Sequence, residues 1–249
     1  MMRKLIPLLS AVFAILILAP ATGWCQYGYG ENLLINPSFE DDTLSRGIPD
    51  GVKYSGRNGI PASTYRGQFF KDDAVAHTGA SSLRLDLPTS NTWARTNPGF
   101  YGNADGSETI LNPQLDAGTL GWKLRLKFWA RDNGAAKPGE FQGPRLFQHP
   151  DEESGGSLAG FTGQMSANAA TYVVDWGNIN ATIDTTWQEY WYEFNVVDNT
   201  HSYSVEWALS DYPNARAAVY SLYIDDVELY YVDADGQPVP AELSSFVLE

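Results

Sequence analysis

The amino-acid sequence predicts an all-β protein, and three observations lead to that prediction. Apolar and polar residues alternate along several segments, which is the two-residue period of a strand with one buried face. Gly, Pro, Asn and Asp, the residues that favour turns, separate these segments. The chain is also rich in ring side chains, with 8 Trp, 14 Tyr and 11 Phe among 249 residues, and aromatic residues favour strands.

The alternation is clearest over residues 81–87, 122–131, 189–197, 201–209 and 220–232. In the first four of these segments every second residue is apolar, which assigns one set of side chains to the core. The side chains assigned to the core are Leu83, Leu85, Leu87, Leu124, Leu126, Phe128, Ala130, Tyr190, Tyr192, Phe194, Val196, Tyr203, Val205, Trp207 and Leu209. Residues 132–170 are rich in Gly, Ala, Pro and Ser, and we expect long loops there with room for one strand.

The N-terminal segment has the layout of a secretory signal peptide. Arg3 and Lys4 precede an apolar run that is too short for a membrane span, and small residues follow it. We therefore expect residues 1–25 to be removed and the rest to be secreted, either extracellular or at the cell surface. Cys25 follows Trp24 and not the small residue that a lipid-anchored cysteine needs. With this single cysteine the mature domain has no disulfide framework.

Size and charge limit the number of domains and the kinds of partner. Removing residues 1–25 leaves 224 residues, enough for one β-sandwich, and moves the net charge from −14 to −16. We assign residues 26–232 to this domain and residues 233–249 to a linker and C-terminal tail. So acidic a chain is not expected to bind nucleic acid, to enter membranes or to take an acidic polysaccharide as its main partner. A neutral polysaccharide or oligosaccharide is compatible with it, and we expect a monomer.

Six short motifs occur along the chain in a recognisable order. They are Asn32-Leu-Leu-Ile-Asn-Pro-Ser-Phe-Glu40, Gly47-Ile-Pro-Asp-Gly51, His77-Thr-Gly-Ala-Ser-Ser-Leu-Arg-Leu85, Leu126-Lys-Phe-Trp-Ala-Arg131, Trp187-Gln-Glu-Tyr190 and Tyr223-Ile-Asp-Asp-Val-Glu-Leu229. In this set the chain resembles the carbohydrate-binding modules of families 4, 9, 16 and 22. The resemblance implies a jelly-roll β-sandwich of two antiparallel sheets, of the galactose-binding-domain-like type and often attached to bacterial glycoside hydrolases. The chain departs from the pattern at Val52, where many members have tryptophan.

The same resemblance implies a structural calcium site. It points to Glu40 and Asp225 as carboxylate ligands, completed by backbone carbonyls of the turn at 77–82. Calcium prefers several hard oxygen ligands and tolerates irregular geometry. Strand parity places Asp225 with Tyr223, Val227 and Leu229, so its charge is costly unless a cation meets it. The alternative is a solvated Asp225 on an edge strand.

Aromatic side chains on the polar faces of strands are the candidates for sugar binding. An indole stacks on the apolar face of a sugar ring while neighbouring polar side chains bond to its hydroxyls. The predicted binding residues are Trp129, Trp191, Arg125, Glu193 and Trp93. The alternative for each tryptophan is a packing role at the end of a sheet or under a loop. Trp187 and Trp207 are assigned to the core, the first by its position in the family pattern and the second by parity.

The sequence offers little for catalysis. Glu193 and Glu206 occupy matching outward positions on strands expected to be neighbours, as a glycosidase pair would, but outward carboxylates are ordinary in so acidic a chain. The histidines show no metal-ligand spacing. We therefore expect a secreted, non-catalytic protein that holds a polysaccharide of the β-glucan or xylan type by aromatic stacking in a sheet groove. The alternatives are an extracellular adhesion β-sandwich without sugar binding, and a glycoside hydrolase or lyase.

Overall fold

The computed structural model describes residues 32–54, 69–89, 95–96, 98–100, 102–105, 110–111, 118–138, 140–149, 172–173, 183–196, 202–210 and 215–239. The regular elements in these ranges are β1 (Val52–Tyr54), β2 (Phe69–Asp72), β3 (Ser82–Leu87), β4 (Arg95–Thr96), β5 (Pro98–Phe100), β6 (Ile110–Leu111), β7 (Lys123–Asp132), β8 (Glu140–His149), β9 (Tyr172–Val173), β10 (Gln188–Asn195), β11 (Ser202–Ser210) and β12 (Tyr220–Val232). All are strands, so the all-β prediction is confirmed. Within these ranges no helix is long and apolar enough to cross a membrane. The expected signal segment and Trp93 lie outside the described residues.

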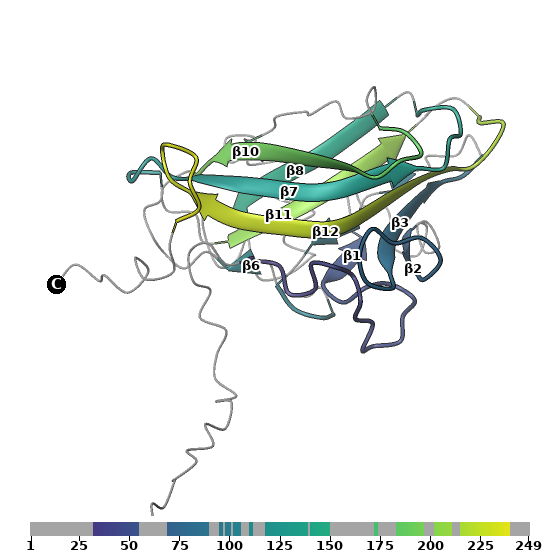
Figure 1. Ribbon diagram of the computed structural model, residues 1–249, viewed down its shortest axis with the longest axis horizontal. Coiled ribbons are helices and arrows are strands. Elements are labelled where there is room, and N and C mark those ends of the chain that lie inside the picture. Colours follow the sequence, from purple (N-terminus) through teal and green to yellow (C-terminus); the bar gives the residue numbers. More distant parts are fainter. Residues whose placement is uncertain are drawn as a thin grey trace, which may run out of the picture.

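The strands form two antiparallel sheets that face each other. One sheet has the order β10-β7-β12-β3-β2, and the other has the order β1-β5-β11-β8-β9, with β4 and β6 also paired to β11. In Figure 1, β10, β7 and β12 lie side by side across β8 and β11. From β3 onward the chain passes repeatedly from one sheet to the other. The resulting order, β3-β12-β7-β10 opposite β5-β11-β8-β9, is that of a jelly roll.

The core lies between the sheets, and alternating side chains of the long strands fill it. Along β7 every second residue is buried, as the sequence predicts, and so are Tyr203, Val205, Trp207 and Leu209 of β11. Phe128 of β7 meets the fully buried ring of Trp207 of β11 edge-on, with ring centres 5.2 Å apart. The hydroxyls of Tyr203 and Tyr231 lie 2.6 Å apart between the sheets. These contacts from opposite sheets make the two layers one hydrophobic unit.

Strand β12 contains a bulge that reverses which of its residues face the core. The register with β7 shifts between Asp225 and Glu228, and Asp226 has a φ of 47°. Before the bulge Ile224 is buried in the core, whereas after it Val227 and Leu229 are. The prediction that Asp225 shares a face with Val227 and Leu229 is therefore wrong, because an extra residue in one strand inverts the alternation beyond it.

Both ends of the described domain are bonded to β12. Residues 32–40 form no strand; instead the backbone of Leu33 bonds to Leu229 at 2.8 Å, which ties this irregular segment to β12. Residues 233–239 are not a linker, since they turn back and bury Val239 to 1% exposure. The folded unit therefore extends past residue 232. Val52, the first residue of β1, is a core residue at 1% exposure.

Candidate functional site

The polar side of the five-stranded sheet, which points away from the core, is called here the outer face. On it, side chains of β10, β7 and β12 stand opposite one another in rows that cross the strands. One row joins Trp191, Lys127 and Glu228, and the next joins Glu193, Arg125 and Tyr230. Neighbouring strands lie about 4.8 Å apart, so side chains of one row are close enough to act on one ligand.

Three of the predicted sugar-binding residues meet on this face. The Nη2 and Nε atoms of Arg125 donate to Glu193 at 2.5 and 3.2 Å, and Lys123 adds a third bond to Glu193 at 3.1 Å. The guanidinium carbon of Arg125 lies 5.2 Å from the centre of the Trp191 ring. Trp191 is nevertheless 58% exposed. The arrangement is an open indole beside a fixed pair of charged hydrogen-bonding groups.

In the Arg125–Glu193 pair, each group stabilises the charged form of the other. Hydrogen bonding to Arg125 lowers the pKa of Glu193, and the same contact raises the pKa of Arg125. Both groups therefore stay ionised around neutral pH. Arg125 also donates to the carbonyl of Gly236 at 3.0 Å, in the turn that follows β12. This bond holds the guanidinium in place from a third direction, which limits the entropy that binding a ligand would cost.

Trp129 lies on the same face in different surroundings. The imidazole of His77 stacks on its indole with ring centres 3.9 Å apart, and His77 Nδ1 lies 2.7 Å from Asp226 Oδ2. Trp187, which was assigned to the core, is half-buried and meets the edge of the His77 ring at 5.6 Å. The assignment was wrong because Trp187 precedes β10 and packs on the outer side of the sheet, where the 77–81 turn crosses it.

A groove of about 480 Å³ adjoins the outer face. Its lining residues are Asn32, Pro37, Ser38, Asp226, Val227, Glu228, Tyr230 and Pro238. Glu228 and Tyr230 belong to both the groove and the outer face, so the two surfaces are continuous. Sequence reasoning missed this groove because the bulge in β12, the irregular segment 32–38 and the returning tail create it together. The Asp-Asp doublet in an apolar strand was the one local signal, since Asp tolerates positive φ.

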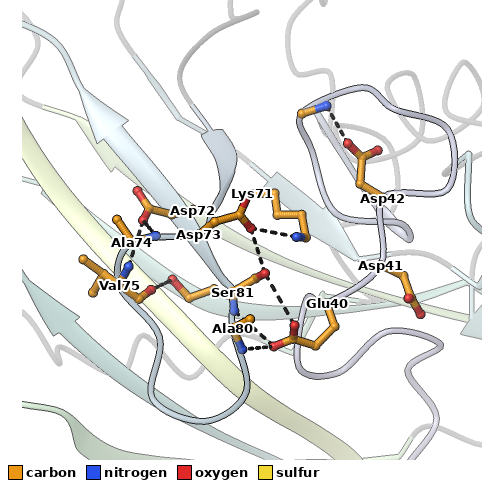
Figure 2. A network of polar contacts seen from close by, with 12 residues as sticks. Glu40, Asp41, Asp42, Lys71, Asp72, Asp73, Ala74, Val75, Ala80 and Ser81 are labelled. Atoms are coloured by element: carbon orange, nitrogen blue, oxygen red, sulfur yellow. Dashed lines mark hydrogen bonds and ion pairs between the residues drawn. The ribbon is translucent and has the colours of Figure 1, made fainter.

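The two predicted metal ligands both hold the turn between β2 and β3. Glu40 Oε1 accepts from the backbone N–H groups of Ala80 and Ser81 at 2.8 and 3.1 Å (Figure 2). The hydroxyl of Ser81 lies 2.8 Å from Asp73 Oδ1 and 3.5 Å from Glu40 Oε2, so two carboxylates converge on it. Lys71 pairs with Asp73 at 2.7 Å. Carboxylate groups therefore hold the turn on one side through hydrogen bonds.

Asp225, on β12 of the sheet, also holds this turn through hydrogen bonds. It is 0% exposed, and its oxygens accept from the backbone N–H groups of His77, Thr78 and Asp226 at 2.7, 3.3 and 2.8 Å. Burial raises the pKa of Asp225 to about 6, although these donors oppose the shift. In the described part of the chain no cationic side chain pairs with Asp225. Nor is any group of three or more His, Cys, Asp or Glu side chains found there that could hold a metal.

The structure does not bring together the pair that would suggest a glycosidase. Glu193 lies on β10, which pairs with β7, whereas Glu206 lies on β11 in the opposite sheet. The expectation that their strands are neighbours is wrong, because in a jelly roll consecutive strands cross between the sheets.

Comparisons with known proteins bear on the fold. No protein-family model and no curated protein sequence matches the chain. Similar solved structures are mostly carbohydrate-binding modules. The CBM22-1 xylan-binding domain of Paenibacillus barcinonensis Xyn10C is 11% identical, with 79% of this chain and 92% of that one covered and a TM-score of 0.41. A family 16 carbohydrate-binding module is 17% identical, with 74% and 98% covered and a TM-score of 0.38.

A larger enzyme structure is also among the similar ones. The arabinose-bound α-L-arabinofuranosidase MgGH51 is 11% identical, with a TM-score of 0.49 over 86% of this chain. The chain spans only 29% of that structure's length. Identities this low concern the fold alone.

Proposed function

We propose that this chain is a secreted, non-catalytic carbohydrate-binding protein that holds a neutral polysaccharide on the outer face of its five-stranded sheet. The observation that carries the proposal is the indole of Trp191, 58% exposed next to the fixed Arg125–Glu193 pair. An exposed aromatic ring supplies the stacking surface that a sugar ring needs, and charged groups held in place bond to its hydroxyls.

The rows of side chains across the strands indicate the direction in which a bound glycan would run. Tyr230 follows Arg125 in the row that begins at Glu193, and it also lines the groove. A linear glycan lying across β10, β7 and β12 would stack on Trp191, pass Arg125 and enter the groove beside Tyr230. Extended chains of the β-glucan or xylan type suit such a path. The net charge of −14 does not oppose a neutral polymer.

Affinity electrophoresis against soluble β-glucan, xylan and mannan tests the proposal. Retardation by at least one glycan is expected, and Trp191→Ala should abolish it or weaken it at least tenfold, which corresponds to about 1.4 kcal/mol. Leu120→Ala is the matched control, because Leu120 is also an exposed apolar side chain, at 54%, but lies in the turn before β7. Absence of retardation by every glycan would contradict the proposal.

We also propose that Glu40 and Asp225 hold a structural calcium ion. Their carboxylates are hard oxygen ligands on one turn, and the buried charge of Asp225 has no cationic side chain to balance it among the described residues. Gly79 leaves room for the Glu40 carboxylate, since a Cβ there would lie 2.1 Å from Glu40 Oε1. When bound, calcium would supply positive charge and a crosslink; Glu40 and Asp225 themselves position the turn.

A further inference from the structure

A third row of side chains crosses the outer face away from Trp191, and it alternates aromatic and guanidinium groups. Phe70 of β2 stands opposite Arg84 of β3, Arg84 opposite Tyr223 of β12, and Tyr223 opposite Arg131 of β7. The guanidinium carbon of Arg84 lies 4.6 Å from the Phe70 ring centre, and that of Arg131 lies 6.0 Å from the Tyr223 ring centre. Arginine next to aromatic faces in this way is typical of surfaces that recognise flat or anionic groups.

The two arginines of this row differ in their partners. Arg84 is paired twice, through Nη1 to Asp72 at 2.5 Å and through Nε to Asp86 at 3.2 Å. Arg131 has no carboxylate partner among the described residues, and its one hydrogen bond there is a long one, 3.5 Å, from Nε to the carbonyl of Asp132. The carboxylate of Asp132 is itself paired with Lys137.

The other cations of the outer face resemble Arg84. Lys123 and Arg125 both pair with Glu193, and Lys127 pairs with Glu189 at 3.2 Å and Glu228 at 3.6 Å. In a chain with 30 acidic and 16 basic residues, most basic groups are expected to find an acidic neighbour. Within the described ranges Arg131 is the one strand cation of this face that has none. No described residue accepts a hydrogen bond from its remaining N–H donors, which could therefore bind a ligand.

Tyr223 provides a second group at the same place. Its ring is half-buried between the two arginines, and its hydroxyl has no hydrogen-bond partner in the part of the chain that the structure describes. A phenol is both donor and acceptor, and its ring offers an apolar face to a sugar. Trp129 lies two residues before Arg131 on the same side of β7. The row is thus continuous with the rest of the outer face.

We propose that Arg131 and Tyr223 form a subsite for a carboxylate-bearing sugar, a uronic acid carried on an otherwise neutral polysaccharide. The planar guanidinium matches a carboxylate with two parallel N–H donors, which a lysine cannot do. The negative net charge of the protein disfavours a polymer made entirely of uronic acids. A mostly neutral polysaccharide with isolated uronic acid units is therefore the expected ligand. This inference rests on the proposed carbohydrate-binding function and adds the substituent that it recognises.

The test compares glucuronoxylan with the same xylan after its glucuronic acid groups have been removed. The wild-type protein should bind the substituted polymer about tenfold more tightly, the range of one charge-assisted hydrogen bond, and the difference should shrink as salt is added. Arg131→Gln should lose the difference while keeping its affinity for the unsubstituted xylan. Lys53→Gln, which removes a positive charge on β1 of the opposite sheet, should keep the difference.

The outcomes separate the two proposals. Equal affinity of the wild-type protein for both polymers, or a difference that survives in Arg131→Gln, overturns the uronate subsite and leaves the carbohydrate-binding function standing. Binding of neither polymer, nor of any other glycan tested, overturns both. Arg131→Lys keeps the positive charge but not the planar guanidinium with its parallel N–H donors, so it should keep only part of the affinity difference between the two xylans. This variant tests the geometry of the subsite even if Arg131→Gln folds poorly.

Discussion

The imidazole ring of His77 lies nearly parallel to the indole of Trp129, at an interplanar angle of 14° with the ring centres 3.9 Å apart. This contact covers one face of Trp129 with a residue of the same chain, whereas Trp191 keeps 58% of its surface exposed. From the sequence alone, the two tryptophans are equal candidates for sugar binding. In the folded protein they occupy different surroundings, and they are expected to respond differently to substitution.

Trp129→Ala should lower the free energy of unfolding by about 1 kcal/mol or more, since it removes a stacked aromatic pair together with its buried area. Trp191→Ala should leave stability nearly unchanged, because an exposed side chain contributes little to it. Urea unfolding followed by fluorescence measures both. A larger loss of stability in Trp191→Ala than in Trp129→Ala would contradict the assignment of Trp191 as the open stacking surface.

Chelation tests the calcium proposal. Treatment with a chelator should lower the melting temperature, because binding to the folded state alone stabilises it, and calcium should restore it whereas sodium should not. Asp225→Asn should abolish the response to both additions. Glu189→Asn, which changes an exposed carboxylate of the outer face, is the control and should respond like the wild type. An unchanged melting curve after chelation would remove the calcium site.

Gly79→Ala should destabilise the turn that Glu40 and Asp225 hold. Gly79 has a φ of 61°, and a Cβ there would lie 2.1 Å from Glu40 Oε1, so Glu40 must move. Gly47→Ala is the matched control, since Gly47 has a φ of 69° with nothing within 4 Å of the added atom. The control should show only the backbone cost, on the order of 1 kcal/mol, and Gly79→Ala should show more. Equal losses would mean that the Glu40 contact is unimportant.

The Glu193 ion pairs should make stability depend on acidity. The folded protein lowers the pKa of Glu193 from its ordinary value of 4.5, so this group stabilises the fold above that value and the contribution is lost as the pH falls through the lowered pKa. The stability gap between wild type and Glu193→Gln should therefore be wide at pH 7 and narrow toward pH 3. Denaturant unfolding at several pH values measures it. A stability difference that does not change with pH would show that the charge of Glu193 does not stabilise the fold.

Much of the fold follows from the sequence because strand alternation is a local property. Each residue of β7 or β11 needs only its neighbours two positions away to reveal its face, which is why Phe128 and Trp207 were placed correctly in the core. The pairing of strands is a different matter. Nothing local shows that β10 adds to β7 and not to β11, and this pairing brings Glu193 to Arg125 while separating it from Glu206.

The sequence by itself determined the all-β class, the faces of the long strands and the presence of Trp191, Arg125 and Glu193 on polar faces, since these depend on residue type and a period of two. Only the tertiary structure decided that His77 covers Trp129, that the bulge at Asp226 buries Asp225 under a turn, and that none of the described carboxylates pairs with Arg131. Such relationships join residues distant in the chain. They depend on strand order and register, which long-range packing sets and local patterns do not encode.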